Sequence, residues 1–494
     1  MIEAYAVVDV RAAEQATMAG LPDGELMARA SAGLAAVVAA RLAEREGTRV
    51  VALVGPGNNG GDALFAVADL AARGITTAAV HSAEAHPGGL TAARAAGVAL
   101  VDGSQDGWAD LVREADVVVD GILGIGGRPG LSGDALAWVD AVLGDAFVIA
   151  VDLPSGADPA GEQGLSDAVF ADETVTFGVP KPVHLMPGTE PAVGRLTVID
   201  IGLDPAVRQG AYRPVVERLT FDDVRRLWPV PDASSDKYSR GVVGIVAGTP
   251  TYPGAAVLSV LGCLGAGPGM VRYLGHPDVQ WLVHQAAPEV VTAAGRVQAW
   301  VLGSGFDPTS RAKGVAEQRR HVEEALASDQ PAVVDAGALE MLDRREAPTL
   351  LTPHAGELAR LLTRLGAGPH GPGEVTRQQV TAAPLAHARA AAQRTGATVL
   401  LKGSHTLVVS PDPARPVRSQ ADAPAWVGTA GAGDVLGGLL GTLLAAGLDP
   451  LDAGALGALV HGVAADEANP GGPVRTSEVA RRIPPTVAGL LRYA

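Results

Sequence analysis

A glycine-rich segment near the N-terminus holds polar residues whose types and order suggest ligand binding. It reads Gly55-Pro-Gly-Asn-Asn-Gly-Gly-Asp62 and lies between an apolar run and a segment with helical spacing. In that position, backbone N–H groups at the start of a helix favour a pyrophosphate. Asn58 and Asn59 add amide groups suited to the polar edge of a ligand or to a monovalent cation. The segment therefore predicts a site for a phosphate-bearing ligand.

The composition makes these side chains unusual. Asn occurs only three times, and two of the three stand side by side in this glycine loop. Lys plus Arg total 38, yet only four are lysines, at positions 181, 237, 313 and 402. Because Arg is the ordinary cation of this chain, each lysine is a candidate for a specific task.

Two aspartates follow apolar runs that read as strands. Asp120 precedes a second glycine loop, residues 121–128, and Asp152 precedes Leu-Pro-Ser155-Gly156. The carboxyl ends of parallel strands meet at one edge of a sheet, so these acids and the first glycine loop are expected to face one crevice. Taken singly, each aspartate could instead cap the next helix.

The first glycine loop is not that of an ordinary dinucleotide-dependent oxidoreductase. Such a domain places an acid about 20 residues further on, to hold the ribose. Here the corresponding stretch reads Thr-Thr-Ala-Ala-Val-His-Ser and contains no carboxylate before Glu84. Hydride transfer is therefore disfavoured.

A second glycine-rich segment near the C-terminus suggests phosphoryl chemistry. It reads Gly428-Thr-Ala-Gly-Ala-Gly433-Asp434 and opens a helix, where small residues let a backbone approach phosphates. Asp434 at the helix start is well placed to take a proton from a hydroxyl that attacks a phosphoryl group. The segment is not a Walker loop, because no Lys-Ser/Thr pair follows. A simple packing helix of small residues is the alternative.

Three further segments come after or before strands in the same half. They are Leu401-Lys402-Gly403-Ser404-His405-Thr406, Thr352-Pro-His354-Ala-Gly-Glu357 and Asp236-Lys-Tyr-Ser-Arg-Gly241. A lone His is more often structural, so the sequence alone favours neither a packing role nor a ligand contact for His354.

The elements that must position these residues alternate between helix and strand. In the first half the pattern predicts helices over about 12–46 and 63–73, and strands at 50–54, 117–120, 147–152, 174–177 and 196–201. In the second half it predicts strands at 241–247, 297–302, 332–335, 349–351 and 399–401. Continuous apolar strands separated by helices indicate parallel sheets covered on both faces.

The pattern breaks at a charged, proline-bearing segment. We therefore predict an α/β protein of two different domains, residues 1–212 and 231–494, joined by a linker at 213–230. The length of 494 residues is too great for one core.

Composition excludes several classes of protein. The net charge of −16 argues against a nucleic-acid partner. The single cysteine, Cys263, excludes an internal disulfide and lies in an apolar stretch typical of buried packing. The N-terminus lacks the pattern of a signal peptide, and no apolar run reaches the ~20 residues of a membrane span. We expect a cytoplasmic homo-oligomer with no membrane partner.

The first half resembles the NAD(P)H-hydrate epimerase family through GPGNNGGD, DGILGIG, VDLPSG and the lysine of FGVPK. The resemblance implies a Rossmann-like three-layer domain in which Asp152 moves a proton with electrostatic support from Lys181. It implies potassium held by Asn59, Asp120 and Ser155. It also implies substrate contacts at Asp152 and at Asn58, Asn59, Gly60, Gly61, Asp62, Gly124, Ile125, Gly126, Gly127, Arg128, Pro129 and Gly130.

The second half resembles the ADP/ATP-dependent NAD(P)H-hydrate dehydratase family, which is ribokinase-like, through KYSRG, TPHAGE, LKG and AGAGD. The resemblance implies Asp434 as general base, and magnesium with ADP or ATP. The implied substrate contacts are Ala256, Gly305, His354 and Asp434. The implied nucleotide contacts are Lys402, Gly403, Ser404, His405, Thr406 and Gly433. The chain departs from the family at Gly337, at residues 303–307 and in the loop before Gly428.

The two resemblances fit one task, the repair of NADHX and NADPHX, the hydrated forms of NADH and NADPH. Phosphorylating the misplaced ring hydroxyl turns it into a leaving group, and a stereospecific dehydratase needs an epimerase to use the other epimer. Two alternatives remain open from the residues. One is a ribokinase-like small-molecule kinase with a ligand-sensing N-terminal domain, and the other is a nucleotide-sensing module with degenerate sites.

Overall fold

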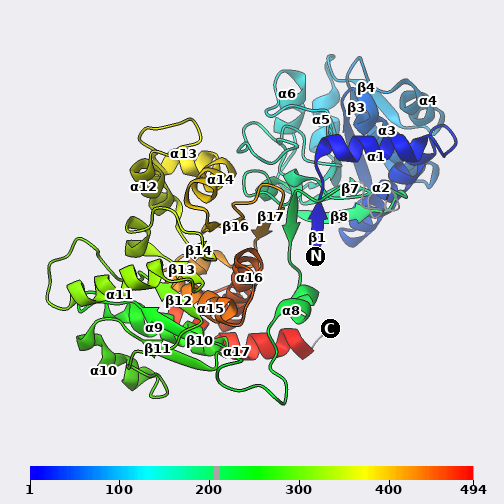
Figure 1. Cartoon of the computed structure of the whole chain (residues 1–494). Helices are drawn as coiled ribbons and strands as arrows, with labels where there is room; N and C mark the ends of the chain where they lie inside the picture. The colour runs from blue at the N-terminus through cyan, green and yellow to red at the C-terminus, as the bar shows by residue number, and fades with distance from the viewer. Residues whose placement is uncertain (204–211, 493–494) are drawn as a thin grey trace. The chain divides into compact units, whose positions relative to one another are not determined.

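The computed structural model describes residues 1–203 and 212–492, and it divides into two compact units. One unit comprises Glu3–Val216 and the other Met1–Ile2 with Glu217–Ala494. The division falls inside the segment 213–230, which also contains strand β9 (Val216–Arg218) and helix α8 (Phe221–Leu227). In Figure 1 the first unit runs from blue to green and the second from green to red.

The first unit is built on a seven-stranded parallel sheet with the order β4-β3-β2-β5-β6-β7-β8. The strands are β2 (Arg49–Val54), β3 (Thr76–His81), β4 (Ala99–Asp102), β5 (Val117–Gly121), β6 (Phe147–Val151), β7 (Glu173–Phe177) and β8 (Arg195–Ile199). The chain builds outward from β2 in one direction and from β5 in the other. The neighbours β2 and β5 therefore form a topological switch point, where ligands of open α/β sheets bind.

Helices cover both faces of this sheet and make a three-layer domain. They are α1 (Val7–Met18), α2 (Glu25–Glu44), α3 (Gly57–Ala72), α4 (Pro87–Ala95), α5 (Trp108–Arg113) and α6 (Asp134–Asp140). One apolar core joins α2, α3 and α4 to one face of the sheet, and another joins α5 and α6 to the other face.

The single helix expected over 12–46 is wrong, because the chain forms two helices there. The break between α1 and α2 contains Pro22 and Gly24, and Gly24 precedes α2 with a left-handed φ of 78°. Proline and a left-handed residue both interrupt an α-helix. Helix α3 also begins earlier than expected, at Gly57, so Asn58 and Asn59 lie in its first turn rather than in a loop.

Strands β10 to β17 of the second unit belong to a larger sheet of the order β1-β9-β17-β16-β15-β14-β13-β12-β10-β11. Strands β10 to β15 are parallel, and β16 and β17 continue the sheet in antiparallel fashion. The bounds are β1 (Ile2–Ala4), β10 (Val242–Val246), β11 (Met270–Tyr273), β12 (Ala299–Leu302), β13 (Ala332–Val334), β14 (Thr349–Leu351), β15 (Thr398–Leu401), β16 (Thr406–Val409) and β17 (Val417–Gln420). The sequence pattern did not predict β11 or the β16–β17 pair.

The helices of this unit are α9 (Pro253–Gly265), α10 (Pro277–Ala286), α11 (Val315–Ala327), α12 (Ala355–Leu365), α13 (Arg377–Ala382), α14 (Pro384–Thr395), α15 (Ala432–Ala445), α16 (Pro450–Ala468) and α17 (Thr476–Arg492). Short 3-10 turns lie at Ala336–Glu340 and Ala425–Val427. Helices α9 and α15 pack closely along each other, since a Cβ at Gly262 would touch the backbone of Val435 and a Cβ at Gly438 would touch that of Ser259. Cys263 is buried in this core, as its apolar surroundings predicted.

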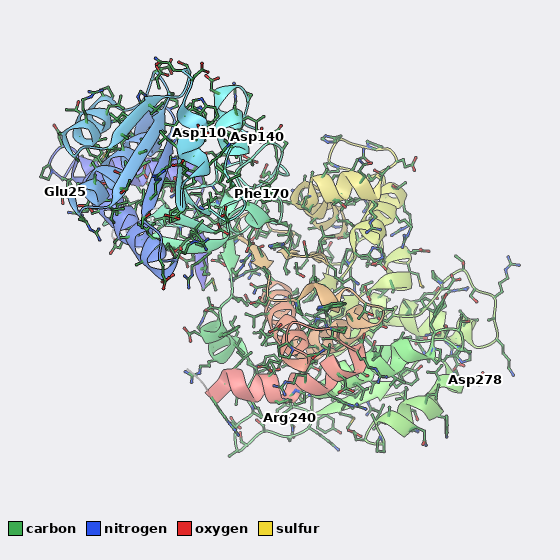
Figure 2. The ribbon with its side chains drawn as sticks, turned by 180° about the vertical axis from the view of Figure 1, so that it is seen from behind. Glu25, Asp110, Asp140, Phe170, Arg240 and Asp278 are labelled. Atoms are coloured by element: carbon green, nitrogen blue, oxygen red, sulfur yellow. The ribbon has the colours of Figure 1, made fainter. Side chains whose placement is uncertain are left out.

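Part of the negative charge of the chain lies on its surface, where Asp278 projects outward (Figure 2). Asp110 is also mostly exposed. One described helix, α2, is long and apolar enough to cross a bilayer by length and composition alone. Its residues Leu34, Val38 and Leu42 are buried in the core of the first unit. A core helix of a globular domain can have the same length and apolar composition as a membrane span.

Candidate active sites

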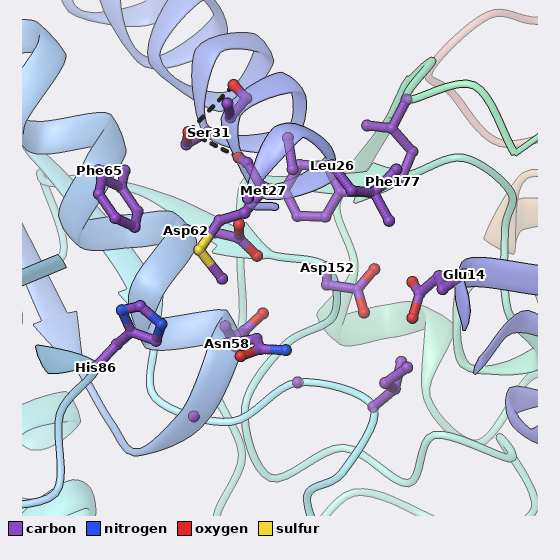
Figure 3. Close-up of a pocket in the computed structure, with 18 of the residues that line it drawn as sticks. Glu14, Leu26, Met27, Ser31, Asn58, Asp62, Phe65, His86, Asp152 and Phe177 are labelled. Atoms are coloured by element: carbon purple, nitrogen blue, oxygen red, sulfur yellow. Dashed lines mark hydrogen bonds between the residues drawn. The ribbon is translucent and has the colours of Figure 1, made fainter. Parts of the chain in front are cut away.

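The first candidate site is a cavity of about 1130 Å³ at the switch point of the first sheet. Helices α1, α2 and α3, the loop Leu123–Gly127, Asp152 and Phe177 form its walls (Figure 3). The cavity brings together predicted residues from three strand ends: Asn58, Asn59, Asp62, Gly124, Ile125, Gly126, Gly127 and Asp152. Arg128, Pro129 and Gly130 do not line it.

Asp152 follows β6 and forms a buried ion pair with Lys181. Lys181 Nζ lies 2.5 Å from Asp152 Oδ1 and also donates to Thr176 Oγ1, which donates to the same carboxylate. Lys181 is only 1% exposed. Burial alone would raise the pKa of Asp152, but the Lys181 ammonium outweighs it and holds the pKa below its usual value. Asp152 is therefore an ionised base inside the cavity.

His184 fixes the backbone beside this pair. Its Nδ1 accepts from Lys181 N at 2.9 Å, so its Nε2 carries the hydrogen and donates to Asp152 O at 2.8 Å. Burial lowers the pKa of His184 to about 4, which keeps the ring neutral. These bonds hold Asp152 in a left-handed conformation, with φ at 66°. Neither His184 nor Thr176 could be distinguished by sequence pattern.

A second corner of this site gathers oxygen atoms around Asp120. Asp120 is fully buried and accepts from Ser155 N, Ser155 Oγ and Ile122 N. Ser155 Oγ also lies 3.2 Å from Leu123 O, and Asn59 packs against Gly124 of the same loop. Burial raises the pKa of Asp120 to about 6. In the described part of the chain no basic side chain pairs with Asp120, and Asn59 Nδ2 is buried without a partner.

Two more carboxyl groups line the cavity. Asp62, predicted as a ligand contact, is 9% exposed, and its Oδ1 has no partner within the described residues. Glu14 on α1 was not predicted, because nothing in the sequence separates it from the other acids of that helix. Burial raises the pKa of both groups.

Gly60 and Gly61 serve the packing of α3. A Cβ at Gly60 would lie 2.3 Å from Gly55 O, and one at Gly61 would lie 3.1 Å from the His86 ring. These glycines let α3 begin close against the end of β2.

The second candidate site lies at the carboxyl edge of the larger sheet. Asp434 is in the first turn of α15, after Gly431 with a left-handed φ of 92°. Burial, together with the charge of Asp335, raises the pKa of Asp434 to about 6. A carboxylate with that pKa is a stronger base than an exposed aspartate.

Lys402 connects the acids of this site. Its Nζ lies 2.9 Å from Asp335 Oδ1 and 3.9 Å from Glu357 Oε2. A Cβ placed on Gly433 would lie 3.1 Å from the same Nζ, so the ammonium sits directly beside the glycine loop. Burial lowers the pKa of Lys402, but Asp335, Glu357 and Asp434 outweigh it and raise the pKa.

The remaining predicted residues surround this group. His354 caps α12, with Nδ1 accepting from Gly356 N and Glu357 N, and about half of its side chain is exposed. Gly403, Ser404 and His405 form the turn between β15 and β16. Gly305 packs against the start of α9 and accepts a hydrogen bond from Thr249, while Ala256 is fully buried against Gly248.

Asp335 is the residue of this site that sequence reasoning passed over. It is 3% exposed, pairs with Lys402 and accepts from Ser304 Oγ at 3.4 Å. Its position at the end of β13, like that of Asp152 at the end of β6, was the available signal.

Two family models match the chain. The NAD(P)H-hydrate dehydratase model matches residues 243–484, and the YjeF-related protein N-terminus model matches residues 23–183. The bifunctional NAD(P)H-hydrate repair enzyme Nnr of Mycobacterium leprae (strain TN) is 41% identical over 495 residues, 96% of each chain. The enzyme of the same name from Mycobacterium tuberculosis (strain ATCC 25618 / H37Rv) is 41% identical over 472 residues, 91% of each chain. A solved structure of the ADP/ATP-dependent NAD(P)H-hydrate dehydratase from Bacillus subtilis, co-crystallized with ATP/Mg2+, is 24% identical, covers 56% of this chain and 99% of that chain, and has a TM-score of 0.48.

Proposed function

Because the chain belongs to the family of bifunctional NAD(P)H-hydrate repair enzymes, we propose that it restores NADH and NADPH from their hydrates at two separate sites. The N-terminal domain, residues 1–212, interconverts the R and S epimers. The C-terminal domain, residues 231–494, dehydrates the S epimer with ADP or ATP. The enzyme acts in the cytoplasm. It forms a homo-oligomer, and size-exclusion chromatography of the pure chain tests this oligomeric state.

One observation about the two sites carries this proposal. In each site a carboxylate that follows a parallel strand is paired with a lysine, Asp152 with Lys181 and Asp335 with Lys402. The other two lysines, Lys237 and Lys313, are exposed. The chain uses arginine for nearly all of its other cations. Its two lysines that are not exposed, Lys181 and Lys402, both lie beside acids at strand ends, which supports two catalytic centres.

In the dehydratase site, Asp434 takes the proton of the ring hydroxyl as that oxygen attacks the terminal phosphoryl group of the nucleotide. The nitrogen lone pair of the ring then expels phosphate and forms a C=N⁺ bond, and loss of a proton from the adjacent ring carbon restores the ring double bond. Lys402, held by Asp335, stabilises negative charge on the phosphoryl oxygens. The turn Gly403–Thr406 and Gly433 hold the nucleotide, and His354, Gly305 and Ala256 contact the hydrated nicotinamide nucleotide.

Magnesium neutralises nucleotide phosphates in phosphoryl transfer. Residues 1–203 and 212–492 contain no cluster of three or more His, Cys, Asp or Glu side chains arranged for a metal ion. The nucleotide phosphates would therefore supply most of the magnesium ligands, with Glu357 and Asp335 nearby.

In the epimerase site, Asp152 moves a proton at the carbinolamine hydroxyl and Lys181 keeps its carboxylate ionised. The corner formed by Asn59, Asp120 and Ser155 suits potassium, because it offers carboxylate, hydroxyl and amide oxygens. No basic side chain among residues 1–203 and 212–492 pairs with the buried Asp120. Potassium there would supply that positive charge and fix the loop Leu123–Gly127.

The decisive experiment mixes the purified chain with hydrated NADH, magnesium and ADP or ATP. We expect the absorbance of dihydronicotinamide to return with release of one phosphate per repaired molecule. A kinase of another small alcohol, the alternative function, would leave the hydrate unchanged and release no phosphate with it.

A further inference from the structure

Glu14 lies on a helix that is fastened to both sides of the first site. Val10 and Ala13 of α1 pack against Val179, close to Lys181 in the chain. Arg11 Nη2 donates to Ile125 O at 3.1 Å, in the loop that forms the cavity wall. These contacts fix α1 across the cavity from Asp152. Figure 3 shows the carboxyl groups of Glu14 and Asp152 turned toward each other.

Asp62 shows that this space is shaped for a ligand. Its Oδ1 is buried in the cavity wall and has no hydrogen-bond partner among the residues that the structure describes. A buried oxygen without a partner costs free energy that a bound donor would recover. The cavity of about 1130 Å³ is large enough for a nicotinamide nucleotide.

The environments of Glu14 and Asp152 shift the pKa values of the two carboxyl groups in opposite directions. Asp152 has a direct ammonium partner, Lys181, and is ionised. Glu14 has no hydrogen-bonded cation among the described residues, and burial, partly offset by the more distant Lys181, raises its pKa. Two facing carboxyl groups whose pKa values are shifted in opposite directions are suited to act as a general acid and a general base.

We propose that Glu14 is the second proton-transfer residue of the epimerase site and acts on the face of the hydrated ring opposite Asp152. The inference rests on the epimerase function proposed above and deepens it. In its protonated form, the carboxyl group of Glu14 gives its proton to the hydroxyl oxygen. The carbon–oxygen bond breaks, the ring nitrogen lone pair forms a C=N⁺ bond, and one water molecule leaves.

Water then adds to the other face of the same carbon. The C=N⁺ electrons return to nitrogen, and the Asp152 carboxylate takes the proton that the water loses. The reverse turnover, or exchange with solvent, restores both carboxyl groups to their starting states. No oxidant, reductant or further reactant is needed. The carboxylate that Glu14 becomes and the carboxylate of Asp152 stabilise the cationic intermediate.

The test starts from the pure S epimer with no nucleotide, so that the dehydratase is silent, and follows the appearance of the R epimer by chromatography. We expect Glu14→Gln to lower kcat about 100-fold while KM changes by less than about threefold. Asp9→Asn neutralises an acid of the same helix that does not line the cavity, and this variant should keep the wild-type rate. Glu14→Asp keeps a carboxyl group that can donate a proton, so its kcat should be higher than that of Glu14→Gln.

Isotope exchange tests the bond that breaks. In H₂¹⁸O the wild-type chain should place ¹⁸O in the ring hydroxyl in step with R formation, and Glu14→Gln should slow both equally. Wild-type kcat in Glu14→Gln, no gain in Glu14→Asp over it, or R formation without ¹⁸O would each overturn the proposal. A wild-type chain that forms no R epimer would instead refute the epimerase function itself.

Discussion

Asp434 combines the position and the basicity that proton removal from a hydroxyl requires. It sits in the first turn of α15 beside Lys402, and its pKa is raised to about 6. We expect Asp434→Asn to lower phosphate release from the S hydrate by about 100-fold or more, because the amide cannot accept the proton. Nucleotide affinity, measured by calorimetry, should change little. Asp466→Asn, an exposed acid on α16, is the matched control, and equal rates in both variants would exclude Asp434 as the base.

The raised pKa of Asp434 also predicts how the dehydratase responds to pH. The carboxylate must be ionised to act, and its ionised fraction falls as the pH drops through about 6. We expect kcat to decrease about tenfold per pH unit well below that value. Asp434→Glu should move this acid limb, whereas a limb that stays in place would belong to another group, such as the nucleotide phosphate.

The 3-10 turn after β13 requires glycine at position 337. A Cβ at position 337 would lie 1.9 Å from Phe306 O, so only glycine lets the loop 303–307 approach the turn. The turn at Gly337 and the loop 303–307 therefore pack directly against each other.

Substitution at this turn gives a test at the scale of the element. Gly337→Ala should lower the free energy of unfolding by about 1–3 kcal/mol, because the new methyl group overlaps backbone. Gly489→Ala, in α17 with open space around it, should raise that free energy by up to about 1 kcal/mol. Denaturant unfolding of both variants measures the difference, and equal shifts would show that crowding at Gly337 is absent.

Sequence pattern predicted most strands that carry site residues, because buried parallel strands are continuous apolar runs that stop at a polar residue or a glycine. Strands β2, β5, β6, β12 and β14 all follow this pattern. It missed β11, whose residues Met270–Tyr273 include Arg272, and it merged α1 with α2, since the apolar spacing continues on both sides of the break.

The contents of the sites were predictable only where residues lie in glycine motifs or at strand ends. Asp120, Asp152 and Asp434 meet that condition. Glu14 lies in the middle of a helix and enters the cavity through the tertiary packing of α1, which no local pattern encodes. Thr176 and His184 are partners of a buried pair, and their roles follow from distances alone.

At the scale of the whole molecule, each unit has its own sheet, core and site. The two activities should therefore be lost separately. We expect Asp152→Asn to spare repair of the S epimer and to slow only the R epimer, and Asp434→Asn to stop repair of both while leaving their interconversion intact. Chromatography of the epimers with a phosphate assay separates these outcomes, and a double variant should show the two losses without coupling.

Ala336, which follows Asp335, stands in the left-handed region with φ at 45°. An alanine held there stores roughly 1–2 kcal/mol of backbone strain in every folded molecule, whether or not ligand is bound. The substitution Ala336→Gly should release this strain and so raise the thermal stability of the protein. The melting temperature should then rise. At the same time Asp335, the partner of Lys402, should become less rigidly held, and kcat should fall. This turn therefore couples thermal stability to catalytic rate.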